Sequence, residues 1–158
     1  MDARGVRRSS SPQTEAIGGL HRGGLRPRLR HQHQGCVLVL QQAARRVNDG
    51  GRIIVSSTGG TRMFFANQSL YLGSKGAVEQ FVRVLATELG PRNVTVNAIS
   101  PGPTETDMMQ DQHRDTVAMM SPFRRIGQPD DVADVALFLA GHEARWVTGQ
   151  NLAGGGVF

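Results

Sequence analysis

The sequence predicts an α/β fold, a doubly wound parallel sheet with helices on both faces. Two short runs rich in β-branched residues, Arg52 to Ser57 and Val94 to Ile99, carry apolar side chains on both faces, as strands buried in a parallel sheet do. A long amphipathic stretch separates the two runs and has short connections to both. Strand, helix and strand in this order are typical of a right-handed βαβ unit.

The predicted elements begin after residue 35, where a polar, arginine-rich segment ends. Residues 36–47 are followed by a turn that ends in two glycines, and a turn of this kind ends a helix. The first strand then leads into Ser57 and Thr58. Hydroxyls that follow a parallel strand lie at the edge where open α/β sheets bind their ligands.

A second helix is predicted from about Leu70 to Leu89, and Gly90-Pro91 ends it. Its apolar residues cover more than a narrow stripe, so we expect it to pack on two sides. One side would contact the sheet, and we hypothesise that the other contacts a second subunit. The apolar set comprises Ala77, Val78, Phe81, Val82, Val84, Leu85, Ala86 and Leu89.

The last third of the chain contains a stiff loop, a methionine-rich segment, a helix and a short strand. Residues 100–107 include two prolines and a glycine, which hold the chain extended at the sheet edge. The Met and Phe residues of segment 108–128 fit either a mobile segment that covers a substrate or a loosely packed pair of surface helices. Residues 129–141 predict a helix with proline and acidic residues in its first turn, and residues 146–152 predict a strand.

The composition fits one soluble globular domain, with 158 residues and a hydrophobic content of 39%. The longest apolar run, Cys36 to Leu40, cannot span a bilayer, which excludes a membrane-embedded protein. Cys36 is the only cysteine, so no internal disulfide can form, and no segment resembles a secretory signal. The expected location is therefore the cytoplasm.

The net charge of +5 is confined to the first 35 residues. They carry seven arginines against Asp2 and Glu15, whereas residues 36–158 carry eleven basic and eleven acidic residues. The segment shows no helical or strand period, which predicts a disordered basic tail. A basic tail attracts phosphates, but this one has no Phe, Tyr or Trp to stack on a base, so nucleic-acid binding is not expected.

Tyr71 and Lys75 form a candidate proton-transfer pair. They are the only tyrosine and the only lysine of the chain, and a spacing of four places both on one face of the predicted helix. A free phenol has a pKa near ~10, and a fixed cation nearby favours release of its proton. Tyr71 can then act as a general acid or base. The alternative is a half-buried tyrosine and a solvated lysine on an amphipathic helix, because the spacing alone is not specific.

Six short motifs occur in order along the chain: residues 51–54 leading into Ser57, Tyr71-x-x-x-Lys75, residues 93–97 leading into Pro101-Gly102, Thr106-Asp107, residues 125–129 and residues 147–150. With these motifs in this order and spacing, residues 36–158 resemble the C-terminal part of the short-chain dehydrogenase/reductase family. The resemblance implies a Rossmann-like fold and hydride transfer between NAD or NADP and an alcohol or carbonyl substrate. It also implies that intact members associate into homo-oligomers.

The resemblance also assigns roles to single residues. Tyr71 exchanges the proton with the substrate oxygen, Lys75 assists this transfer and binds the nicotinamide ribose, and a strand-end hydroxyl steadies the substrate oxygen. Ser57 and Thr58 lie fourteen and thirteen residues before Tyr71, and both spacings are familiar within the family. We favour Ser57, because a serine is usual at this position. The implied cofactor-binding residues are Tyr71, Lys75, Pro101, Gly102, Thr104 and Thr106.

The first half of the family pattern is missing, since no strand-like run precedes a Gly-rich turn in residues 1–35. The alternative function is therefore a non-catalytic remnant, which cannot bind cofactor and keeps only subunit-contact surfaces. Residues 29–36 can be encoded by a nucleotide sequence that, moved by one position, reads Phe-Asp-Thr-Asn-Thr-Lys-Gly-Val, as the family would have before Val37. We hypothesise that residues 1–35 are an out-of-frame translation, which leaves the sheet N-terminally incomplete.

Overall fold

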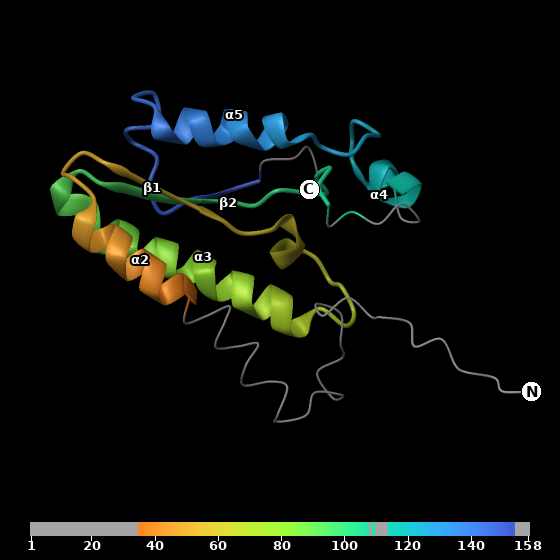
Figure 1. Ribbon diagram of the computed structural model, residues 1–158, viewed down its shortest axis with the longest axis horizontal. Helices are drawn as coiled ribbons and strands as arrows, with labels where there is room; N and C mark the ends of the chain where they lie inside the picture. Colours follow the sequence, from red (N-terminus) through yellow and green to blue (C-terminus); the bar gives the residue numbers. More distant parts are fainter. Residues whose placement is uncertain (1–34, 108, 110–113, 154–158) are drawn as a thin grey trace, which may run out of the picture.

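The computed structural model describes residues 35–107, 109 and 114–153 (Figure 1). The predicted basic tail up to residue 34 lies outside the described residues, as do Met108 and residues 110–113 of the methionine-rich segment. The helices and strands that follow all belong to the described ranges.

The sheet has three parallel strands in the order β1 (Arg52–Ser56), β2 (Thr95–Ile99) and β3 (Asn151–Leu152). The register pairs Arg52 with Thr95 at the start of β1 and Ala98 with Asn151 between β2 and β3. All five residues of β2 are buried, as the continuous apolar run predicts for a central strand. The expected parallel sheet is confirmed.

Helices cover both faces of this sheet (Figure 1). Helices α2 (Gly35–Arg46) and α3 (Ser69–Leu89) lie on one face, and α5 (Pro129–Ala140) lies on the other. Each face has its own apolar core, one centred on Val82 and Val96 and the other on Ile99 and Leu139. This arrangement confirms the doubly wound architecture, with α3 as the crossover helix between β1 and β2.

Helix α3 packs on two sides, as its wide apolar face predicts. Val82 is 1% exposed against the sheet, while Phe81 and Leu85 belong to the same core, which α2 also joins through Leu40. The hypothesis placed a second subunit on the outer side of α3. Helix α2 of the same chain covers part of that side, and the contact with a second subunit stays a hypothesis.

Strand β1 is less buried than its sequence predicts. Of its five residues only Ile53 is buried, and Ile54 and Val55 are half-buried. Within the described residues β1 pairs with β2 along one edge alone. Its apolar side chains still contact the cores on both faces, but no neighbouring described strand shields them along the outer edge.

The last strand is shorter than predicted, because residues 146–150 form no strand, and Trp146 is 95% exposed. Gly149 has a φ of +69°, which breaks an extended path. Backbone bonds from Gly149 N to Val96 O and from Ala98 N to Gln150 O, each of 2.8 Å, still hold this segment to β2. The buried Asn97 adds two side-chain bonds: it donates from Nδ2 to Val147 O over 2.7 Å and accepts from Gln150 N over 3.0 Å. Residues 147–150 are thereby fixed to β2.

The methionine-rich segment contains one short helix in its described part, α4 (Arg114–Met120). Met119 is 62% and Phe123 is 71% exposed, so these side chains add little to the core. Arg114 forms an ion pair with Glu105 that ties α4 to the loop after β2. Among the helices that the structure describes, none is both long and apolar enough to cross a membrane.

Candidate active site

The loops that follow β1 and β2 meet at the carboxyl edge of the sheet. Ser57 N donates to Ile99 O over 2.7 Å, and Gly59 N donates to Pro101 O over 2.8 Å. A Cβ atom at Gly59 would lie 3.3 Å from Pro101 O, so the close approach of the two loops favours glycine here. Ligands of open α/β sheets bind at this edge, and Ser57, Thr58, Pro101 and Gly102 belong to these two loops.

Tyr71 and Lys75 lie on the first two turns of α3, and both are half-buried. The Lys75 ammonium donates to Ser56 O over 3.0 Å, which fixes the cation beside the end of β1. No hydrogen bond of the Tyr71 hydroxyl is found within the described residues, whereas its backbone carbonyl accepts from Ser74 Oγ over 2.7 Å. The phenol therefore has its donor and acceptor available next to a held cation.

The two candidate hydroxyls have different surroundings. Ser57 is 4% exposed, and its hydroxyl donates to Glu79 Oε1 over 2.6 Å. Thr58 continues the extended backbone with φ −153° and ψ 143°, so its side chain points away from that of Ser57, and its Oγ1 accepts from Gly60 N over 3.3 Å. The Ser57–Glu79 bond is buried, and the Thr58–Gly60 bond caps the short helix η3 (Gly59–Arg62).

The loop that carries the predicted cofactor-binding residues is held by a backbone bridge between Thr104 and Gly127. Gly127 N donates to Pro103 O over 3.0 Å, and Glu105 N donates to Gly127 O over 2.8 Å. The Thr104 hydroxyl donates to Gly102 O over 3.0 Å. Residues 102–105 are thus fixed from within the loop and from the segment before α5, and the exposed Thr106 follows them.

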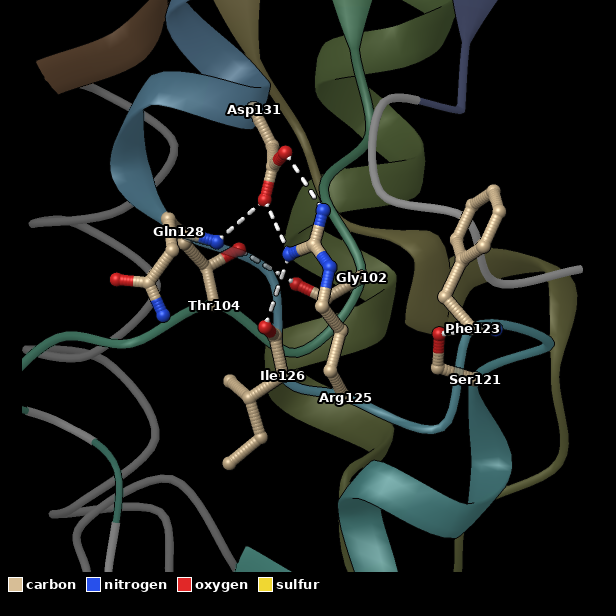
Figure 2. Close-up of polar contacts among 8 residues, drawn as sticks. All are labelled: Gly102, Thr104, Ser121, Phe123, Arg125, Ile126, Gln128 and Asp131. Atoms are coloured by element: carbon tan, nitrogen blue, oxygen red, sulfur yellow. Dashed lines mark hydrogen bonds and ion pairs between the residues drawn. The ribbon is translucent and has the colours of Figure 1, made fainter.

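Figure 2 shows the contacts that anchor this segment. The Arg125 guanidinium makes two bonds to the Asp131 carboxylate, of 2.6 and 2.8 Å, and Gln128 N donates to the same carboxylate over 2.6 Å at the start of α5 (Figure 2). The hydrogen bond from Arg125, followed by that from Gln128 N, holds the pKa of Asp131 well below its ordinary value of 3.8. The same bond raises the pKa of Arg125.

Sequence reasoning missed two features of this region. Residues 125–129 were recognised only as a motif, because an ion pair at a spacing of six has no periodic signal. Glu79 was also missed, although a usable signal exists. It is a charged residue four positions after Lys75, on the face of α3 that is otherwise buried.

A separate depression of about 660 Å³ lies at the opposite end of the strands, beside the start of β1 and β2. Its lining includes Arg52, Asn93, Thr95 and Trp146. None of the predicted site residues lines it. Volume alone therefore does not locate the chemistry, and the residues at the carboxyl edge remain the candidate site.

Comparison with known proteins identifies the family of the chain. A family model described as enoyl-(acyl carrier protein) reductase matches residues 13–156. The short chain dehydrogenase claC of Passalora fulva is 39% identical in an alignment of 140 residues, which covers 77% of this chain and 52% of that protein. The short chain dehydrogenase/reductase dmxR18 of Cryptosporiopsis sp. is 42% identical in an alignment of 135 residues, which covers 75% of this chain and 51% of that protein.

The chain belongs to the short-chain dehydrogenase/reductase family. Solved structures of the family agree in fold. The angucycline C-6 ketoreductase LanV with bound NADP matches with a TM-score of 0.84 and 32% identity, covering 92% of this chain and 58% of that one. A short-chain dehydrogenase/reductase from Serratia marcescens gives a TM-score of 0.84 at 32% identity, with 92% and 61% covered.

Membership confirms the resemblance and the Rossmann-like fold that it implied. The chain spans about half the length of the curated short-chain dehydrogenases that it matches. The strands and loops described above supply the carboxyl edge that carries Ser57, Tyr71 and Lys75.

Proposed function

We propose that this chain carries the proton-transfer part of an NAD(P)-dependent oxidoreductase that moves a hydride between the cofactor and an alcohol or carbonyl compound. The observation that carries the proposal is the pair on α3. Lys75 is held by Ser56 O, and the phenol of Tyr71, one helical turn away, has no competing hydrogen bond within the described residues.

The proposed roles follow from the chemistry of these groups. Tyr71 gives its proton to a carbonyl oxygen in the reductive direction, or takes one from an alcohol in the oxidative direction. The positive charge of Lys75 favours the phenolate form and so assists both directions. Ser57 is the proposed hydroxyl that contacts the substrate oxygen, and Thr58 is the alternative.

The residues at the carboxyl edge fit the nicotinamide end of a cofactor. Lys75 Nζ has three hydrogens and donates one to Ser56 O, so two remain as donors for a ribose hydroxyl. The loop with Pro101, Gly102, Thr104 and Thr106 is held by backbone hydrogen bonds and lies at the same edge of the sheet. When bound, NAD or NADP supplies or accepts the hydride. The pyrophosphate end has no counterpart in the described residues, which include no G-x-G-x-x-G turn between a strand and a helix.

The similarity to LanV, whose structure is described with bound NADP, supports the cofactor class. The names of the relatives support a small-molecule alcohol or carbonyl substrate. The proposal includes a cytoplasmic location, supported by Cys36, a free thiol and the only cysteine of the chain.

The proposal also includes a homo-oligomer that buries the outer surface of α2. Val37, Leu38 and Val39 are 43%, 59% and 68% exposed there. Three neighbouring apolar residues at the surface of one helix are a feature of contact surfaces.

Equilibrium titration with NADPH and NADH tests the proposed function. The purified full chain is expected to quench or shift cofactor fluorescence with a dissociation constant in the micromolar range. Turnover is followed by NADPH absorbance with 9,10-phenanthrenequinone as a carbonyl probe. The Tyr71→Phe variant should lose turnover, because it lacks the proposed proton donor. Glu88→Gln, at an exposed carboxylate outside the proposed site, is the matched control and should keep both cofactor binding and turnover. Absence of binding up to millimolar NADPH and NADH would contradict the proposal.

A further inference from the structure

Glu79 is a buried carboxylate inside α3. Its residue is 8% exposed, and its Oε1 atom accepts hydrogen bonds from Ser57 Oγ and Thr61 Oγ1, each over 2.6 Å. Burial of a carboxylate is costly unless hydrogen bonds compensate it, and two hydroxyls do so here. Within the described residues Glu79 has no ion pair with Lys75, whose ammonium binds Ser56 O instead. The Glu79 carboxylate therefore binds the hydroxyls of Ser57 and Thr61 and not the ammonium of Lys75.

Glu79 continues the row of the proposed catalytic residues. Tyr71, Lys75 and Glu79 are spaced by four, so they lie one above another on the same face of α3. This face crosses the end of β1, where Lys75 contacts the carbonyl of Ser56 and Glu79 contacts the hydroxyl of Ser57. One helix face thus holds two consecutive residues at the strand end.

The direction of the bond determines what Ser57 can do. A hydroxyl has one hydrogen and two lone pairs, and in this bond the Ser57 hydroxyl is the donor and Glu79 Oε1 is the acceptor. The hydrogen of Ser57 must therefore point to Glu79. Thr61 differs, because Thr58 O is a second acceptor for its hydroxyl at 2.9 Å. For Ser57 no other acceptor is found within the described residues, so Glu79 alone fixes its hydrogen.

We infer that Glu79 is a positioning residue that sets the polarity of the Ser57 hydroxyl. The hydrogen is directed to Glu79, so the oxygen lone pairs are what Ser57 can offer to a further partner. Ser57 then accepts a hydrogen bond, from a substrate alcohol or from the phenol of Tyr71, and donates none to a carbonyl oxygen. Tyr71 is left as the donor to the carbonyl oxygen. The inference rests on the proposed function, in which Ser57 contacts the substrate oxygen.

Kinetics of the full chain with NADPH and 9,10-phenanthrenequinone test the positioning role. Glu79→Met removes the acceptor at similar volume and should lower kcat about tenfold with little change in KM. Glu79→Gln keeps an acceptor oxygen and should restore most of the loss. In a Ser57→Ala background, Glu79→Met should have no further effect on kcat. Glu88→Gln, at an exposed carboxylate on the same helix, is the matched control and should keep the wild-type kcat.

Two kinetic results would overturn the inference. One is that the effects of Ser57→Ala and Glu79→Met on kcat multiply. The other is that Glu79→Gln is no better than Glu79→Met, which would indicate a structural role alone.

Thermal unfolding gives a readout that does not need activity. The midpoint shifts of Ser57→Ala and Glu79→Met should not add in the double variant, because both remove the same hydrogen bond. Additive shifts would overturn the inference. If Glu79→Met does not fold, Glu79→Gln replaces it in the same comparison with Ser57→Ala. A neutral amide oxygen is the weaker acceptor, so Glu79→Gln should also lower the unfolding midpoint. If the wild type is inactive but the midpoint shifts of the two variants do not add, the proposed function is contradicted. The Ser57–Glu79 hydrogen bond is then still established.

Discussion

Lys75 acts through its position, because its ammonium is held by Ser56 O one helical turn from Tyr71. Tyr71→Phe removes the proposed proton donor, and Lys75→Met removes the charge while keeping the length of the side chain. Each is expected to lower kcat about 10²- to 10⁴-fold, the usual contribution of general acid–base catalysis. NADPH consumption measures this loss, and circular dichroism checks that the variants fold. A variant with near wild-type kcat would remove that residue from the proposed mechanism.

Ser57 and Thr58 can be separated by single substitutions at the strand end. We expect Ser57→Ala to lower kcat at least about tenfold and Thr58→Ala to keep it, because the Ser57 oxygen is held in place by Glu79. Rates measured at saturating NADPH compare the two. The reverse result, with activity lost only in Thr58→Ala, would assign the substrate contact to Thr58, which points the other way from the extended strand end.

At the scale of elements, the Arg125–Asp131 pair joins the proposed cofactor loop to the start of α5 (Figure 2). The folded-state pKa of Asp131 is depressed, so its contribution to stability is fully present above the ordinary value of 3.8. It is lost as the pH falls from about 4 through the folded-state pKa.

Asp131→Asn removes the charge in this pair and should make the protein less stable at neutral pH. Its unfolding midpoint should also depend less on pH below about 4 than that of the wild type. Thermal unfolding from pH 7 to pH 2 measures both effects. Because both side chains are substantially exposed, the effect should weaken at high salt. If the unfolding midpoints of the wild type and Asp131→Asn fall equally with pH, the Arg125–Asp131 pair does not link pH to stability.

Helix α3 owes its position to packing against β2. Val82 is 1% exposed, whereas Val84 on the same helix is 47% exposed. Val82→Ala is expected to lower the free energy of unfolding by about 2 kcal/mol, and Val84→Ala by less than about 0.5 kcal/mol. Urea denaturation measures the two values. Equal losses would mean that the outer side of α3 is also buried in solution.

For the whole molecule, the outer edge of β1 and the exposed apolar residues of α2 predict self-association. Within the described residues β1 has one paired edge, and Val39 is 68% exposed. Light scattering should show a mass above that of the 17.1 kDa chain at micromolar concentration. Val39→Lys should lower this mass if α2 forms the contact. A monomer with a sharp, cooperative thermal transition would contradict the prediction.

The origin of residues 1–35 stays a prediction that the coding DNA tests. A shifted reading frame without stop codons that encodes a Gly-rich turn upstream of Val37 is the expected result. Stop codons in that frame would contradict the out-of-frame hypothesis.

The sequence by itself determined the parallel α/β architecture, the bounds of α3 and α5 within one or two residues, and the placement of Tyr71 and Lys75 one turn apart on α3. These features depend on local patterns, namely hydrophobic periodicity, terminal Gly and Pro residues, and a spacing of four on a helix. Such patterns act within one element and can be identified without tertiary contacts.

Only the tertiary structure decided which groups face one another. Glu79 accepts a hydrogen bond from a hydroxyl 22 positions away, and the positive φ of Gly149 shortens the predicted last strand to Asn151–Leu152. The partial exposure of β1 likewise depends on which strands lie beside it. Hydrogen-bond partners and burial are set by the packing of distant segments, and a local pattern does not encode that packing.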